Sequence, residues 1–298
     1  MRRGLKIAAM CLICSVMCFF PMLAAETIHI AINDSPWLSA FRGMVELYEE
    51  TTGRFVELHV FPYGGLYEKL VTEASRAGDT FDVILLDDPW TAFFFTMGYV
   101  TPLAEIDASY VVPDEVFPYA GIYKWDYVTN YRSVDGQLMG LPINVNMHLF
   151  YYRSDLFEEA GLPIPETWED VKAAAKALHD PSKPLYGYGH RGQKGNPVVF
   201  NFLPVLYSHG GRIFADPPHD WSVVVNSPEA KSALRFWVGL TEYGLPGVTA
   251  VGQAELIAAL ATGKCAQAIV VSAGAWQMDD PDYSTIPGKM QYLSLIHI

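Results

Sequence analysis

Apolar residues in the first hundred positions follow a strand pattern and a helix pattern in turn. The short stretches at 28–32, 56–61 and 81–86 predict three strands, the first of them buried and the third continuously apolar after Asp82. Between them, apolar residues recur at helical spacing over 37–48, and a second helix is expected over 67–76. Strands that alternate with helices predict an α/β domain on a parallel-rich sheet, and the run at 81–86 predicts a strand covered on both faces.

Residues that typically begin or end a helix are easier to recognise in the second half of the chain than in the first. Thr167, followed three residues later by Asp170, predicts a capping box at the start of a helix over 168–179. A tight turn between two short strands is expected at 134–137. Further helices are expected from 227 to 244 and over 253–262, with a strand at 266–271.

The N-terminus has the layout of a secretory signal peptide over residues 1–25. Basic residues precede an apolar run at 7–20, and the small pair Ala24-Ala25 follows. A signal anchor is the alternative, because the run is just long enough to span a bilayer. Cys11, Cys14 and Cys18 lack the small-residue context that a lipoprotein needs before its cleavage point. We therefore expect a periplasmic product without a lipid anchor.

Composition narrows the partners of the mature chain. Cleavage after residue 25 would leave 17 basic against 33 acidic residues, a formal net charge of −16, which repels nucleic acid and anionic lipid. Cys265 would then be the one remaining cysteine, so no intrachain disulfide is expected. The length favours two domains, and we expect a monomer.

The last six residues, 293–298, match the translated mosaic end of transposon-based sequencing libraries. We interpret them as an artefact, so that the natural reading frame would continue beyond residue 292. A genuine short apolar C-terminus is the alternative.

Four segments resemble one known family. The long stretch GLPINVNMHLFYYRSDLFEEAGLPIPETWEDVKAAAKAL at 140–178 resembles extracellular solute-binding proteins of bacterial ABC transporters, in the sugar-binding branch that includes maltose-binding protein. Segments 81–106, 201–214 and 226–270 resemble the same family. The resemblance implies an α/β, two-lobed periplasmic-binding-protein fold with a ligand cleft between the lobes, C-terminally truncated so that the second crossing is incomplete.

That resemblance also implies domain boundaries. The N-terminal lobe would span 26–143, the C-terminal lobe 144–280, and residues 281–292 would begin the return to the first lobe. The lobes would rock about 141–149 and 272–280 as they close on the ligand.

The function implied is capture of a mono- or oligosaccharide for a membrane permease, without catalysis, metal or cofactor. A binding protein for a polyamine or a glycerol-phosphate ester shares the architecture and stays open as an alternative. A secreted carbohydrate-active enzyme is a further alternative.

Candidate ligand residues follow from the loops after strands, where open α/β sheets bind ligands. A carboxylate beside an aromatic face suits sugar recognition, because the acid accepts hydroxyl hydrogen bonds and the ring covers the C–H face. The first-lobe candidates are Trp37, Tyr63, Asp87, Asp88 and Trp90, and those expected around the cleft are Asn144, Asn146, Gly211 and Trp276.

Several candidates have a purely structural alternative. Asp87 or Asp88 could cap the helix that begins at Pro89, and one residue could do each job. Trp90 could pack against neighbouring phenylalanines, and Trp37 lies on the apolar stripe of its helix. Gly211 could simply belong to a helix-ending turn.

Three sequence patterns could suggest an enzyme or a metal site, and none of them has the context that such a site needs. Residues 187–192 fit the G-x-G-x-x-G spacing, but Gly195 and Pro197 follow where a helix must begin. Adjacent Asp87 and Asp88 point apart on an extended chain, which does not suit a glycosidase. The histidines show no i, i+4 pair and no cysteine partner, so no zinc site is expected.

Overall fold

A computed structural model describes residues 26–113 and 123–295. These described residues divide into two compact units: the first holds 26–33 together with Phe41–Leu85, and the second holds Asp34–Ala40 and the described residues from Leu86 onward. The expected signal peptide lies outside the described residues, and the lobe boundaries at 143/144 and 280/281 stay predictions.

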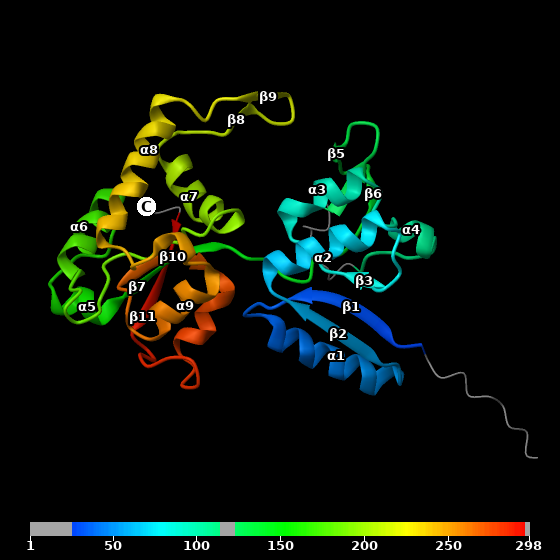
Figure 1. Ribbon diagram of the computed structural model, residues 1–298, viewed down its shortest axis with the longest axis horizontal. Coiled ribbons are helices and arrows are strands. Elements are labelled where there is room, and N and C mark those ends of the chain that lie inside the picture. Colours follow the sequence, from blue (N-terminus) through cyan, green and yellow to red (C-terminus); the bar gives the residue numbers. More distant parts are fainter. Residues whose placement is uncertain (1–25, 114–122, 296–298) are drawn as a thin grey trace, which may run out of the picture. The chain divides into compact units, whose positions relative to one another are not determined.

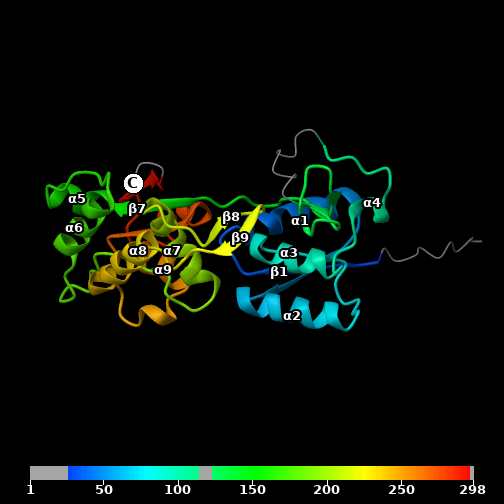
Figure 2. The same cartoon turned by 90° about the horizontal axis from the view of Figure 1, so that it is seen from above.

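A parallel sheet organises the first unit. β1 (Ile28–Asn33) pairs with β2 (Val56–Phe61) over six residues and with β3 (Val83–Ile84) on its other side, which gives the order β2-β1-β3. α1 (Leu38–Thr52) and α2 (Tyr63–Ser75) lie on opposite sides of this sheet (Figures 1 and 2). The predicted parallel α/β pattern is confirmed here.

The third strand differs from its prediction. β3 has two residues, and Val83 is 49% exposed, so the expectation of a strand buried on both faces is wrong. Backbone hydrogen bonds from Asp82 to His29 and from Leu85 to Ala31, each 2.9 Å, flank the strand. The apolar run therefore pairs as expected, but within the described residues it forms an outer strand of the sheet.

An antiparallel sheet forms the centre of the second unit. β7 (His148–Arg153) lies between β10 (Gln267–Val271) and β11 (Met290–Ser294). Alternate side chains of β7 enter two cores: Phe150 and Tyr152 pack in one, and Tyr151 packs in the other. The first core is built with α6 (Trp168–Leu178), α7 (Asn196–Ser208) and α8 (Pro228–Gly239), and the second with α9 (Gln253–Ala261) and the 3-10 helix η4 (Ser272–Met278).

Local sequence signals place the helices of this unit. The Thr167 side chain accepts a hydrogen bond from the Asp170 amide, and Asp170 accepts from the Thr167 amide, so the predicted capping box is confirmed. Ser227 caps α8 as its sequence predicts. Gly263, at φ +72°, follows α9 in the left-handed conformation that favours glycine.

The turn predicted at 134–137 joins strands that do not pair with each other. β5 (Tyr131–Arg132) and β6 (Gln137–Leu138) both pair with β4 (Lys124–Asp126). The remaining elements are α3 (Asp88–Thr96), α4 (Leu103–Ile106), α5 (Ser154–Glu159), β8 (Phe214–Asp216), β9 (Asp220–Val223), η2 (Leu240–Tyr243) and η3 (Val248–Ala250). Among the residues described, no helix has the length and apolar character needed to cross a bilayer.

Candidate functional site

The start of α3 combines a cap with an ion pair. The Asp87 carboxylate accepts a hydrogen bond from the Asp88 amide at 3.0 Å and caps the helix. The Asp88 carboxylate pairs instead with the Arg132 guanidinium at 2.5 Å, and the same guanidinium nitrogen donates to Thr91 Oγ1 at 3.1 Å. The two adjacent acids thus take different roles, and Asp88, half exposed, is the one presented toward solvent.

Two polar residues of this cluster escaped the sequence analysis. Arg132 lies on β5, 44 positions from Asp88; β5 pairs with β4, whose Trp125 ring meets Phe95 of α3 edge to face at 5.8 Å between centroids. Tyr123 is half buried, and its pKa is raised first by burial and then by the negative charge of Asp88. Both residues lie in a stretch with loose hydrophobic periodicity, which gave no signal for them. Together they give the start of α3 a cation and a phenol beside its carboxylates.

Trp90 is 8% exposed and its side chain belongs to the protein core. This burial favours the packing interpretation of Trp90, because a ring that stacks on a sugar needs an open face. Its role as a ligand contact stays a prediction.

Trp276 is the more accessible of the two indoles, at 39% exposed. Its indole N–H donates to the Pro36 carbonyl at 3.1 Å, and its ring meets Tyr283 edge to face at 5.0 Å between centroids. Pro36 directly precedes Trp37, which is half buried. The structure therefore brings Trp276 to the loop that carries Trp37, two candidates 239 positions apart in sequence.

The two stretches expected to act as hinges are hydrogen-bonded to each other. The Ser272 amide donates to the Met147 carbonyl at 2.8 Å, and the Met147 amide donates to Ser272 Oγ at 3.2 Å. In the preceding segment Asn144 is half buried and Asn146 is exposed, so the Asn146 side chain is accessible to a ligand.

His148, the residue after Met147, and Arg191 both contact the ring of Phe200. The His148 ring contacts Phe200 at a tilt of 42° with 3.6 Å between ring centroids, and the Arg191 guanidinium lies 4.8 Å from the same ring's centroid. Burial, together with the Arg191 charge, lowers the pKa of His148 to about 4. The imidazole is therefore neutral at physiological pH, and sequence reasoning had no signal for this cluster.

Gly211 lies at a close contact between two helices of the second unit. A Cβ at Gly211 would lie 2.5 Å from Leu206 Cδ1 and 3.1 Å from Ala230 Cα, so glycine is needed here for the close approach of α7 and α8. Tyr63, half buried, is the first residue of α2 and belongs to the other unit. Packing accounts for Gly211, and ligand contact by either residue stays a prediction.

Residues 34–290 match the family described as bacterial extracellular solute-binding protein, and the chain belongs to this family. The match includes every candidate residue named above. The family resemblance inferred from the sequence is confirmed.

Individual relatives agree with this assignment. The chain is 29% identical over 252 residues to the mannitol-binding protein of Pseudomonas aeruginosa, covering 83% of this chain and 55% of the relative. It is similar to a solute-binding protein of Agrobacterium radiobacter in complex with ribitol (TM-score 0.78, 26% identity, 89% and 65% of the two chains). It is also similar to one of Agrobacterium vitis with bound D-mannitol (TM-score 0.74, 28% identity, 91% and 64%).

The predicted fold class, α/β with the two-lobed architecture of periplasmic binding proteins, is confirmed by these structures. The match to the mannitol-binding protein covers 83% of this chain but 55% of that protein, so the chain spans about half the length of this relative.

Proposed function

We propose that the chain captures a small neutral polyhydroxy compound, a sugar or a sugar alcohol, for import by an ABC transporter. The observation that carries this proposal is the nature of the ligands of three relatives that match more than four fifths of this chain at 26–29% identity. A mannitol-binding protein and two structures that hold ribitol and D-mannitol all take a linear sugar alcohol. A linear polyol is therefore our first choice of ligand, with monosaccharides and oligosaccharides next.

Chemistry at the start of α3 supports a polyhydroxy ligand. The Asp88 carboxylate can accept hydroxyl hydrogen bonds while its other oxygen stays with Arg132, and the Arg132 guanidinium has further donors to offer. Trp276 and Trp37 offer apolar faces near the Pro36 carbonyl. Hydroxyl-bonding groups and apolar faces are the two kinds of contact that a chain of C–OH groups can make.

The remaining parts of the function follow from the family and the sequence. We propose that residues 1–25 direct export to the periplasm, that the partner is a membrane permease, and that the chain acts as a monomer without catalysis. The segments 141–149 and 272–280 are our candidates for the hinge, and the hydrogen bonds between Met147 and Ser272 join them.

Isothermal titration calorimetry on the purified chain tests the proposal. D-mannitol, ribitol and D-glucitol form the first panel, maltose and glucose the second, and spermidine and glycerol 3-phosphate the third. Saturable one-to-one binding of a neutral polyhydroxy compound is the expected result. Binding confined to the third panel, or release of reducing sugar from a glycoside, would contradict it.

A further inference from the structure

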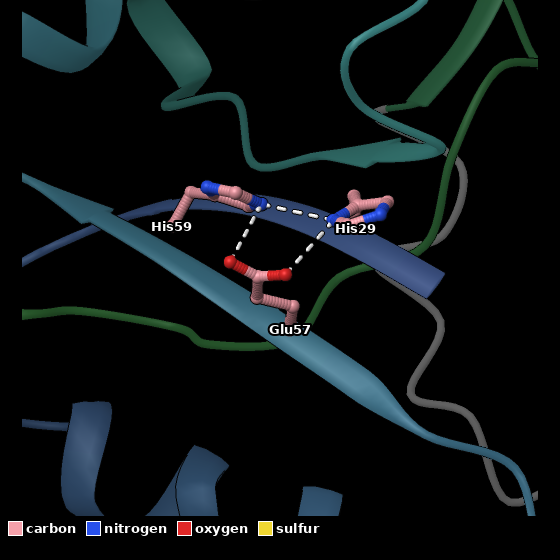
Figure 3. Close-up of side chains that lie close together, drawn as sticks. All are labelled: His29, Glu57 and His59. Atoms are coloured by element: carbon pink, nitrogen blue, oxygen red, sulfur yellow. Dashed lines mark hydrogen bonds and ion pairs between the residues drawn. The ribbon is translucent and has the colours of Figure 1, made fainter. Parts of the chain in front are cut away.

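Strand pairing in the first unit brings two histidines and a glutamate together. His29 on β1 pairs in register with Glu57 on β2, and His59 follows two residues after Glu57. Because side chains two apart on a strand share one face, Glu57 and His59 both point to the side on which His29 lies. Figure 3 shows the three side chains converging, with the carboxylate between the two imidazoles.

Neighbouring polar atoms of the group lie about as far apart as ligand atoms around a tetrahedral ion. His29 Nδ1 lies 3.0 Å from His59 Nε2, Glu57 Oε2 lies 3.5 Å from His29 Nδ1, and Glu57 Oε1 lies 3.7 Å from His59 Nε2. Bonds of about 2.0–2.1 Å to a tetrahedral zinc ion separate two ligand atoms by about 3.3 Å. The three distances bracket this value, so an ion at the centre of the group would need only small side-chain adjustments.

We propose that His29, Glu57 and His59 form a binding site for a divalent transition-metal ion of the zinc class. Two imidazoles and one carboxylate suit zinc, nickel or copper(II), whereas magnesium and calcium prefer oxygen ligands throughout. In the part of the chain that the structure describes, His29, Glu57 and His59 are the one group of three His, Cys, Asp or Glu side chains close enough together to share an ion.

Access and charge agree with the proposal. The side chains of His29, His59 and Glu57 are 37%, 28% and 59% exposed, so an ion can enter from solvent and keep a water molecule as its fourth ligand. The glutamate supplies one negative charge. Lys69, whose ammonium lies over the neighbouring Phe81 ring, is ion-paired with Glu73, which reduces its repulsion of a cation.

The surrounding residues hold the ligands in place. Phe81 meets the His59 ring edge to face at 5.2 Å between centroids. The His29 amide donates to Asp82 Oδ2 at 2.8 Å, and six paired residues fix the register of β1 on β2. An ion bound here would link β1 to β2, two strands joined through α1, and would therefore stabilise the first unit.

A helical zinc motif would show two histidines at i and i+4 or a cysteine partner, and this sequence shows neither. The Glu57–His59 spacing of two residues is the strand equivalent, and the third ligand comes from a strand 28 positions away. Register between strands, which the sequence alone does not give, is what assembles the group.

Calorimetric titration of zinc chloride into the chelator-treated, tag-free chain is the primary test. One ion per chain is expected, and cobalt(II) should give the visible absorption of a low-symmetry nitrogen–oxygen site. His29→Gln, His59→Gln and the isosteric Glu57→Gln should each weaken zinc binding by about tenfold or more. His219→Gln, at an exposed histidine between β8 and β9, is the matched control and should bind as the wild type does.

Thermal unfolding gives a second readout. Zinc should raise the unfolding temperature of the wild type and of His219→Gln, but not that of Glu57→Gln. Non-saturable zinc binding by the wild type, or equal affinity in all four variants, would overturn the proposal. Polyol titrations with and without zinc separate this result from the proposed transport function, because failure of either measurement leaves the other unaffected.

Discussion

Asp88 is the residue at which the candidate ligand site can be tested most directly. Asp88→Asn keeps the side-chain shape but removes the charge that attracts Arg132 and strengthens hydroxyl hydrogen bonds. We expect polyol affinity to fall about tenfold to a hundredfold, since a hydrogen bond to a charged group contributes about 1.5–3 kcal/mol. Stability should change little, because an exposed ion pair contributes at most about 1 kcal/mol. Calorimetry and urea unfolding measure the two effects.

The control for this variant is Asp79→Asn, at an exposed aspartate of the first unit. Unchanged polyol affinity in Asp88→Asn, with full affinity also in Asp79→Asn, would remove Asp88 from the site and leave Trp276 and Asn146 as the candidates to test next.

His190 sets a pH dependence of stability. It is fully buried between Tyr188 and Trp237, with ring centroids 4.7 and 5.0 Å away, and its Nε2 lies 3.1 Å from the Trp237 carbonyl. Burial lowers the pKa of His190 to about 4, although the hydrogen bond opposes this shift. An unfolded histidine titrates near 6.5, so between these values the unfolded chain binds more protons than the folded chain.

The free energy of unfolding should therefore fall as the pH drops from about 6.5 toward about 4, by roughly 3 kcal/mol at most for this residue. Carboxylates titrate near pH 4 in the unfolded chain, so the interval from about pH 6.5 to 5 isolates the histidines. Urea unfolding at several pH values should show a shallower slope for His190→Gln. Equal slopes in both proteins would contradict the assignment.

At the scale of the elements, the contact between α7 and α8 decides what Gly211 does. A Cβ at this position would collide with Leu206 and crowd Ala230. We expect Gly211→Ala to destabilise the protein by about 1–3 kcal/mol, as overpacking of a core typically does, while folded molecules keep their polyol affinity. Gly239→Ala, where nothing lies within 4 Å of the added Cβ and the backbone is helical, is the matched control and should stabilise the protein by about 0.4–1 kcal/mol. Loss of affinity without loss of stability would instead place Gly211 at the ligand.

The elements also show which features sequence reasoning reaches. The cap of α6 was predicted because Thr167 and Asp170 interact across a single turn. The exposure of Val83 was not predicted, because a continuously apolar run does not show what packs beside the strand. The Asp88–Arg132 pair depends on the packing of α3 against strands 44 positions away, and the group of His29, Glu57 and His59 depends on strand register across 28 positions. Hydrogen bonds between residues close in sequence can be predicted from the sequence, whereas contacts between distant strands and helices cannot.

At the scale of the whole molecule, net charge distinguishes the proposed ligand from its main rival. The chain carries a formal charge of −13, which attracts a polyamine at long range but leaves an uncharged polyol unaffected. Raising the ionic strength from 0.01 M to 1 M shortens the screening length from about 30 Å to about 3 Å. Polyol affinity should therefore change by less than about twofold over this range, whereas spermidine affinity should fall by more than about tenfold. Calorimetric titrations at the two salt concentrations measure both. Strong salt dependence of the best-binding ligand would mean that the carboxylates attract a cation, and the transporter would then be one for a charged amine.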